Sequence, residues 1–403
     1  GSVKFVEQNL LNTDLTLNLS QNIPWTGGSL FLETSAQRMD LFSEHKYSWQ
    51  TSPIMIGYRQ SLFGYNSLKW DKRIEPVRYQ EAKKSYVETL ELVSANAINK
   101  FFALATAQSN YDIASFNYAN ADTLYRYAQG RYNIGTITEN EMLQLELNRL
   151  TEETNRMNAR IEMDNCMQEL RSYLGIQEER EIRVRVSSRI PDFSINLNEA
   201  LALAYENSPD IQTMKRRKLE SESAVARARA NAGLKADIYL RFGLTQTADK
   251  LPEAYRNLLD QQYVSLSISL PILDWGRGKG QVRVARSNRD LVYTQVEQSR
   301  TDFELNVRKL VKQFNLQTQR VRIAARTDET AQRRNEVARK LYILGKSTIL
   351  DLNASISEKD SARRNYVSAL YNYWSLYYTL RSMTLYDFES NKLLTEDYNL
   401  LIE

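Results

Sequence analysis

The sequence predicts a mainly α-helical fold with a smaller β part, built from two copies of one structural unit. Three observations support this prediction. Sequence patterns recur at an offset of about 210 residues. Each copy opens with segments in which apolar and polar residues alternate, and each continues with a helical pattern much longer than a globular helix. The length of 403 residues would by itself allow two or three ordinary domains.

Three pairs of matching segments fix the offset without a gap between them. The pairs are 60–66 with 270–276, 132–135 with 342–345, and 170–172 with 380–382. One such match could arise by chance, whereas three at one offset indicate duplication. We therefore divide the chain into a first structural repeat, residues 1–180, and a second, residues 181–403.

Strands open each repeat. The apolar residues of 264–272 alternate with Ser265, Ser267 and Ser269, and 238–244 alternates in the same way. Alternation of period two places apolar and polar side chains on opposite faces of a strand. We expect strands over about 15–62 in the first repeat and about 238–272 in the second.

The start of the first repeat departs from the second. By the offset, its copy of the helix expected at about 197–231 would precede residue 1, so we expect that this helix and any secretory leader are missing from the sequence. Leu15, Leu17 and Leu19 alternate with polar residues where the second repeat is helical. We expect an extra strand there.

Long helical hairpins follow the strands, over about 72–175 and about 281–384. Apolar residues from Tyr86 onward keep a three-and-four spacing that is typical of a coiled-coil seam. Gly135 and Gly345 stand where a left-handed residue commonly ends a helix, so each hairpin is expected to turn at a glycine. A short strand is expected at 182–186, and the C-terminal segment from 385 shows no clear period.

Composition excludes several function classes. The 53 basic and 49 acidic residues are interspersed, which argues against a nucleic-acid-binding face. His45 and Cys166 are the only residues of their kinds, so no metal or disulfide framework is expected. No set of nucleophile, base and orienting residue is apparent, so we predict no enzyme activity and no cofactor. The longest apolar runs, such as 101–105, are too short for a transmembrane helix.

The order of these elements resembles the TolC, or outer-membrane-factor, family. The local resemblance is carried by 197–209, which looks like the family's opening helix, by the strand-to-helix passage 266–276, and by the Tyr-x-x-Gly turns in 132–136 and 342–346. The resemblance implies a homotrimer in which each subunit gives four strands to a twelve-stranded outer-membrane β-barrel and its helices to a periplasmic α-barrel.

The same resemblance implies the function and the partners. Such a protein is an outer-membrane channel that extends into the periplasm and forms the passive exit duct of a tripartite efflux or type I secretion system. Its partners would be two further copies, a periplasmic adaptor, an inner-membrane pump and outer-membrane lipid. Drug, protein and metal export all remain open.

The helical tips are the functional site that the resemblance implies. The turns and adaptor contacts would fall on Tyr132, Gly135, Thr136, Tyr342, Gly345 and Lys346, and the gate and pore constriction on Asn140, Glu141, Tyr342, Ser347 and Asp351. Ser347 replaces an arginine of TolC, which puts that protein's salt-bridge latch in doubt here. Alternatively, Glu141 and Asp351 simply favour helix N-termini.

A second function class is a soluble coiled-coil scaffold, in which the alternating segments form a small capping sheet. A capping sheet should expose charged side chains to water, whereas 264–272 places Val, Leu and Ile on one face and a row of serines on the other.

Trp25, Trp49 and Trp275 flank strands and fit interfacial girdles, although ordinary packing explains each tryptophan equally well.

Overall fold

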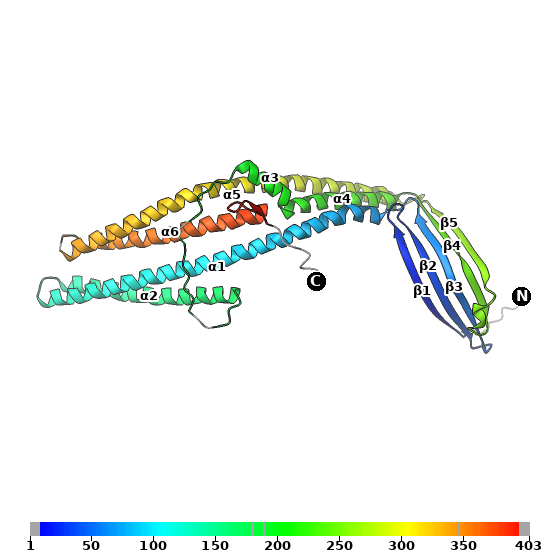
Figure 1. The fold of residues 1–403 in the computed structure, drawn as a ribbon, viewed down its shortest axis with the longest axis horizontal. Coiled ribbons are helices and arrows are strands. Elements are labelled where there is room, and N and C mark those ends of the chain that lie inside the picture. The colour runs from blue at the N-terminus through cyan, green and yellow to red at the C-terminus, as the bar shows by residue number, and fades with distance from the viewer. Residues whose placement is uncertain (1–8, 179–180, 188–189, 345, 395–403) are drawn as a thin grey trace. The chain divides into compact units, whose positions relative to one another are not determined.

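The computed structural model describes residues 9–178, 181–187, 190–344 and 346–394 (Figure 1). Its elements run in the order β1 (Leu10–Ile23), β2 (Gly28–Leu41), β3 (Lys46–Ser61), α1 (Ser67–Asn133), α2 (Glu139–Tyr173), α3 (Leu197–Asn207), α4 (Pro209–Ala232), β4 (Lys235–Ala248), β5 (Leu259–Ser269), α5 (Arg277–Ile343), α6 (Ile349–Thr384), β6 (Tyr386–Asp387) and β7 (Lys392–Leu393). A short 3₁₀ helix at Glu253–Tyr255 joins β4 to β5. None of the described helices is long and apolar enough to cross a membrane.

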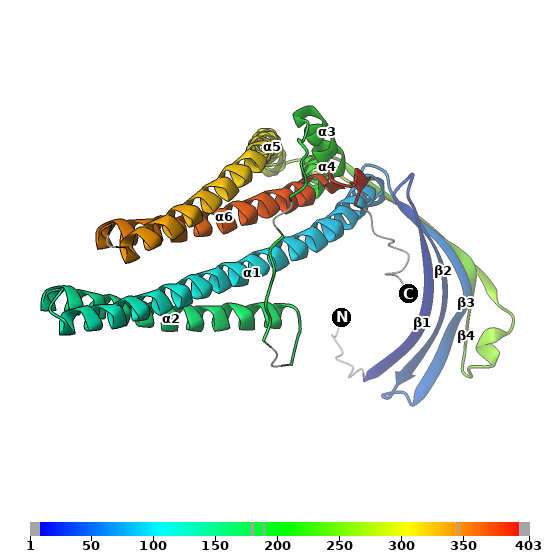
Figure 2. The same cartoon turned by 60° about the vertical axis from the view of Figure 1, so that its left-hand side comes forward.

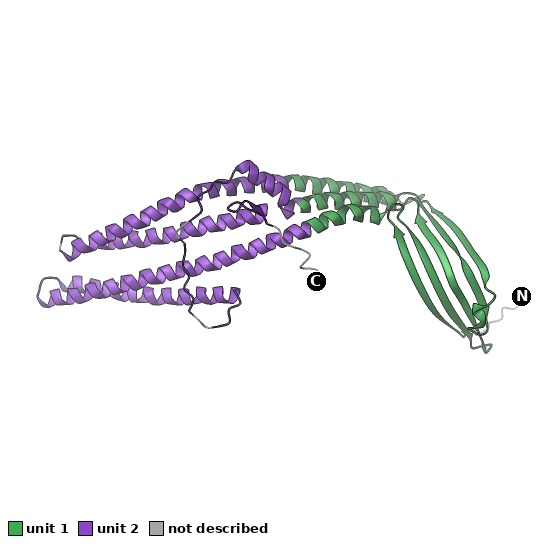
Figure 3. Cartoon of the chain, in the orientation of Figure 1, with its two compact units in different colours: residues 1–80, 212–299 green, residues 81–211, 300–403 purple. Residues whose placement is uncertain are grey.

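The chain forms two compact units (Figure 3). The sheet unit comprises Gly1–Gln80 and Gln212–Ser299, and the helical unit comprises Glu81–Ile211 and Arg300–Glu403. Each unit therefore combines segments from both of the repeats that the sequence predicts.

One antiparallel sheet holds the strands in the order β1-β2-β3-β4-β5 (Figures 1 and 2). The prediction of four strands per subunit is therefore wrong for this sheet, because β1 adds a fifth. Its alternating leucines, already visible in the sequence, are the physical reason, since period-two patterning suits a strand.

The apolar face of the sheet is open over all five strands. Leu15, Leu17 and Leu19 of β1 are 72 to 78% exposed, and Val264, Leu266 and Ile268 of β5 are 61 to 67% exposed. The cross-strand pairs in between continue the same face, because Leu19 lies opposite Leu32 and Ile56 opposite Phe242. Within the described sheet unit, no other layer covers these side chains.

On the polar face, side chains pack closely around Phe31. Phe31 and Met55 are buried there, and the Phe31 ring stacks on Tyr239 with 5.8 Å between ring centroids. Gly57 lies directly opposite Phe31, and a Cβ at Gly57 would come within 2.0 Å of the ring. Only glycine therefore lets Phe31 lie flat across the neighbouring strand.

The long helices recur at the predicted offset. α5 begins 210 residues after α1 (277 minus 67), and α6 begins 210 residues after α2 (349 minus 139). Both α1 and α5 have 67 residues. The sequence bounds of the hairpins, about 72 and 281, placed both starts a few residues late. Pro76 lies inside α1, beyond its first turn.

Two other sequence expectations need correction. The helix expected at about 197–231 is divided at Ser208, whose backbone is extended. Pro209 explains the break, because proline disfavours a helical conformation in the residue before it. Residues 182–186 form no strand ladder.

The segment 182–186 is instead held by side chains. The amide of Gln108 donates to the Ile182 carbonyl at 3.0 Å and accepts from the Val184 N–H at 3.2 Å. Ile182 and Val184 pack on a buried cluster of the helical unit that includes Leu104 and Leu170. The alternating sequence pattern of 182–186 therefore reflects packing of one side of the segment against the helices, with no partner strand.

Candidate functional site at the helical tips

The first tip turns at a glycine, as its position predicts. Gly135 has φ +74°, in the left-handed region that favours glycine. Its N–H donates to the Tyr132 carbonyl at 2.8 Å, and the Thr136 N–H donates to the Arg131 carbonyl at 2.9 Å. This pair of bonds is a Schellman motif, which satisfies the carbonyls at the end of α1.

The second tip repeats part of this geometry. The Lys346 N–H donates to the Leu341 carbonyl at 2.9 Å, which matches the bond from Thr136 at the first tip. Gly345 itself lies outside the described residues. The predicted turn at that glycine therefore stays a prediction.

Both returning helices begin with a capping box. At α2, the Thr138 hydroxyl accepts from the Glu141 N–H at 3.3 Å, and the Glu141 carboxylate accepts from the Thr138 N–H at 2.9 Å. At α6, Thr348 and Asp351 form the same reciprocal pair, and the Thr348 hydroxyl also donates to the Asp351 carboxylate at 2.7 Å. Each carboxylate thus has a local role at a helix start.

The surroundings of Asp351 favour the ionised form of its carboxyl group. Hydrogen bonds from the Thr348 hydroxyl and backbone N–H hold the pKa of its carboxyl below the ordinary value. The Ser347 hydroxyl adds a weaker bond at 3.3 Å. Asp351 is therefore ionised across the physiological pH range.

The two hairpins meet at Tyr342. A cavity of about 580 Å³ lies between the tips, and Arg131, Thr136, Glu141, Tyr342 and Thr348 are among the residues that line it. Burial raises the pKa of the Tyr342 hydroxyl, which keeps it a neutral hydrogen-bonding group. The cavity is thus lined by the Arg131 guanidinium, the Glu141 carboxylate and the Tyr342 phenol.

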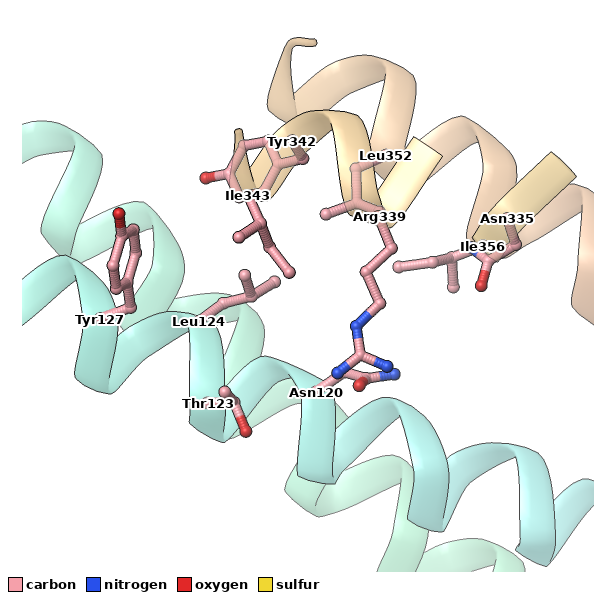
Figure 4. A pocket seen from close by; sticks show the side chains of 10 residues that line it. All are labelled: Asn120, Thr123, Leu124, Tyr127, Asn335, Arg339, Tyr342, Ile343, Leu352 and Ile356. Atoms are coloured by element: carbon pink, nitrogen blue, oxygen red, sulfur yellow. The ribbon is translucent and has the colours of Figure 1, made fainter. Parts of the chain in front are cut away.

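A second cavity of about 180 Å³ adjoins it between α1, α5 and α6 (Figure 4). Leu124, Ile343, Leu352 and Ile356 give it an apolar lining. Arg339 extends from α5 toward Asn120 of α1 in the close-up view. Tyr342 lines both cavities.

The structure brings together only some of the predicted residues. Thr136, Glu141 and Tyr342 line the larger cavity, whereas Asn140, Ser347 and Asp351 are not among the residues that line either cavity. The predicted adaptor-contact residue Tyr132 is 38% exposed, and the Lys346 side chain is also exposed.

Sequence reasoning missed Tyr127, Arg131 and Arg339. Tyr127 of α1 lines both cavities, and the Arg131 guanidinium lies 5.9 Å from its ring centroid. The available signal was the four-residue spacing of Tyr127 and Arg131, which places both side chains on one helix face. No group of His, Cys, Asp and Glu side chains in the described part of the chain could hold a metal ion.

Residues 200–384 match the family model described as outer membrane efflux protein. The outer membrane protein TolC of Escherichia coli (strain K12) is 21% identical to this chain over 311 residues, which cover 74% of this chain and 61% of that protein. The chain therefore spans less than two thirds of the length of this curated relative.

Solved structures match nearly the whole chain. The Campylobacter jejuni CmeC outer membrane channel matches with a TM-score of 0.68 and 14% identity, over 98% of this chain and 80% of that one. The outer membrane protein VceC of Vibrio cholerae matches with a TM-score of 0.66 and 14% identity, over 93% of this chain and 87% of that one. The fold of the chain is that of the TolC-like channels.

Proposed function

We propose that this chain, with its TolC-like fold and its match to the outer membrane efflux proteins, is a channel subunit in the outer membrane. It forms the exit duct of a tripartite efflux or type I secretion system and extends into the periplasm. Transport through it is passive, and the energy comes from an inner-membrane pump.

The observation that carries this proposal is the open apolar face of the sheet. Side chains such as Leu17, Leu266 and Ile268 are more than half exposed, while the opposite face carries Ser265, Ser267 and other polar groups. Exposure of the apolar face to water is unfavourable, because each Å² of apolar surface left exposed forgoes about 25 cal/mol of stabilising free energy. In a barrel wall, lipid acyl chains would contact the apolar face and water inside the barrel would contact the polar face.

The soluble scaffold is the less favoured function. A capping sheet would need charged side chains on its open face, and the strands instead carry Leu, Ile and Val there. The matches to outer membrane channels point in the same direction.

Closure of the wall requires further copies of the chain. One chain gives too few strands to enclose a water-filled bore, and head-to-tail contacts generate a closed ring. We propose a homotrimer that joins a periplasmic adaptor at the helical tips. Exposed groups such as Tyr132 and Lys346 would contact the adaptor.

The gate is proposed at the same tips. Tyr342, Glu141 and Arg131 share one cavity, so a hydrogen-bonded link between the hairpins is available in the closed channel. Asp351 from three subunits would form an acidic ring that favours cations. Replacing Asp351 with Asn should weaken cation preference in single-channel recordings. Unchanged preference would leave Asp351 as a capping residue only and make Glu141 the next candidate.

The function itself is tested on purified protein. In detergent, the mass of the protein part should equal three subunits, and insertion into planar bilayers should produce discrete conductance steps. A protein that stays monomeric and dissolved without detergent, with no conductance, would support the scaffold.

A further inference from the structure

Basic residues gather in the turns of α1, α4 and α5 that lie next to the sheet. We call this region the basic collar and define it as residues 67–76, 224–232 and 277–288. The collar has a formal charge of +7, whereas the whole chain has +4, so the remainder of the chain is net negative. Its two acidic residues are Asp71 and Glu75, and its nine basic residues are Lys69, Lys72, Arg73, Arg227, Arg229, Arg277, Lys279, Arg283 and Arg286.

The three segments of the collar are packed together at one end of the sheet (Figures 1 and 3). Just before α1, the Tyr65 hydroxyl is hydrogen-bonded to the Ser223 hydroxyl of α4 at 2.5 Å. α4 and α5 approach each other so closely that a Cβ at Gly278 would lie 3.0 Å from the Cβ of Ala232. The positive charges of three helices therefore share one small region.

The basic side chains of the collar are exposed and have no partner of opposite charge. None of the nine forms an ion pair with another described residue. Arg73 and Arg227 instead lie against aromatic rings, at 4.8 Å from the ring centroid of Trp70 and 4.6 Å from that of Tyr65. Like charges held close together repel each other. An anionic partner from outside the chain would therefore stabilise the collar.

A band of exposed apolar side chains separates the sheet from the collar. In the passage from β5 to α5, Ile272 and Trp275 are both 90% exposed, and Leu273 is 71% exposed. The order along the chain is thus an apolar strand face, an apolar band with a tryptophan, and a basic helix. Hydrocarbon, interface and charged headgroups follow one another in the same order in a membrane leaflet, and tryptophan is enriched at the interface.

We propose that the basic collar binds the headgroups of anionic phospholipids in the periplasmic leaflet of the outer membrane. This inference rests on the proposed channel function, which sets the sheet in the membrane and the helices in the periplasm. Lys and Arg next to a membrane surface attract anionic lipids, and the attraction falls off over a Debye length of about 8 Å. The collar charges closest to the sheet should therefore contribute most.

A different partner would be an anionic solute in transit through the duct. Such a solute would also be attracted by exposed Lys and Arg side chains. It gives no reason, however, for the exposed Ile272 and Trp275 between the sheet and the collar, whereas a membrane interface requires such a band. The lipid is therefore the better match.

Lipid retention tests the proposal. Full-length protein in detergent is mixed with equal amounts of dioleoyl phosphatidylglycerol and dioleoyl phosphatidylcholine, and the lipid retained after removal of the excess is quantified by mass spectrometry. The wild type should retain phosphatidylglycerol in several-fold excess. Raising the ionic strength about tenfold should reduce this excess, because salt screens exposed charges.

Three variants assign the preference to the collar. Lys279, Arg283 and Arg286 recur on one face of α5 at spacings of four and three. Replacing all three with Gln should lower the phosphatidylglycerol excess by at least about threefold, because each removed charge weakens the attraction. Lys279→Arg/Arg283→Lys/Arg286→Lys keeps the charges and should keep the excess. So should the matched control Lys309→Gln/Lys312→Gln/Arg320→Gln, which removes three exposed charges at least 30 residues further along α5 than Lys279.

Two results would overturn the proposal. One is equal retention of both lipids by the wild type. The other is the same phosphatidylglycerol excess in the wild type and in the collar Gln variant. If that variant instead shows a weaker anion preference of its conductance, the collar charges act on solutes in the duct.

Conductance separates this failure from failure of the channel function. In planar bilayers of phosphatidylcholine alone, the wild type and the collar Gln variant should both produce discrete conductance steps. Conductance steps without any lipid preference would overturn the role of the collar and leave the channel intact. A protein that produces no steps and stays monomeric and dissolved without detergent would contradict the proposed function itself.

Discussion

The sheet and the helical unit place their apolar side chains in opposite ways. In the helical unit, Leu104, Phe314 and Tyr373 are fully buried, and charged residues occupy the outer surfaces. In the sheet, Leu17 and Ile268 are mostly exposed, and the packed aromatic Phe31 lies on the polar face. This contrast is what the proposed channel requires, with water around the helices and hydrocarbon around the sheet.

The largest expected effect is in the helical core. Leu104→Ala should lower the free energy of unfolding by about 2 to 5 kcal/mol, because it leaves a cavity beside Met163 and Leu170. The matched change Leu17→Ala should cost far less, since its side chain packs on no core in the subunit. Denaturant unfolding in detergent, followed by circular dichroism, measures both, and equal losses would contradict the contrast.

Charge on the sheet should reveal which face meets lipid. Ile268→Arg should cost about 2 to 4 kcal/mol if the residue lies near the bilayer midplane, because the guanidinium would enter hydrocarbon. Ser267→Arg, on the polar face, should be tolerated. The amount of folded protein recovered from outer membranes compares the two variants. Similar recovery of both variants would contradict the proposed assignment of the apolar face to lipid and the polar face to water.

Glycine substitutions test the packing on the polar face. Gly57→Ala should destabilise the sheet by about 1 to 3 kcal/mol, because the new methyl group collides with the Phe31 ring. A Cβ at Gly130, inside α1, would meet no atom within 4 Å. Gly130→Ala should therefore stabilise by about 0.5 to 1 kcal/mol through helix propensity. Thermal denaturation of both variants should show shifts of opposite sign.

The smallest effect is the pH dependence of the second tip. Because the folded-state pKa of Asp351 is depressed, its contribution is present above the ordinary carboxyl pKa and is lost as the pH falls through the folded value. Hydrogen exchange at the first turn of α6 should accelerate at acid pH. In Asp351→Asn this acceleration should be absent. An unchanged acid response in the variant would assign the pH dependence to another group.

Much of the architecture could be predicted because it depends on local patterns. Period-two alternation indicated the strands, proline-free helical spacing indicated α1 and α5, and Gly135 marked its turn. The strand count was wrong because the family resemblance supplied four strands, whereas Leu15, Leu17 and Leu19 in the sequence already indicated another. The division at Ser208 was missed although Pro209 was its signal.

The candidate site was less predictable, since it depends on side chains that meet only in three dimensions. Nothing in the sequence places Arg131 of α1 beside Tyr342 of α5, about 210 residues away. Capping boxes were more accessible, because Thr138 and Glu141 have the required spacing. The gating and adaptor roles of these tips remain predictions.

Cysteine labelling at Ser267 and Ile268 in intact outer membranes tests the central claim most directly. The two residues are neighbours on one edge strand and are both exposed in the subunit, so only the surroundings of the assembled protein can distinguish them. We expect rapid modification of Ser267→Cys by a small aqueous thiol reagent and slow modification of Ile268→Cys. Equal modification of both residues would mean that the sheet does not separate lipid from water.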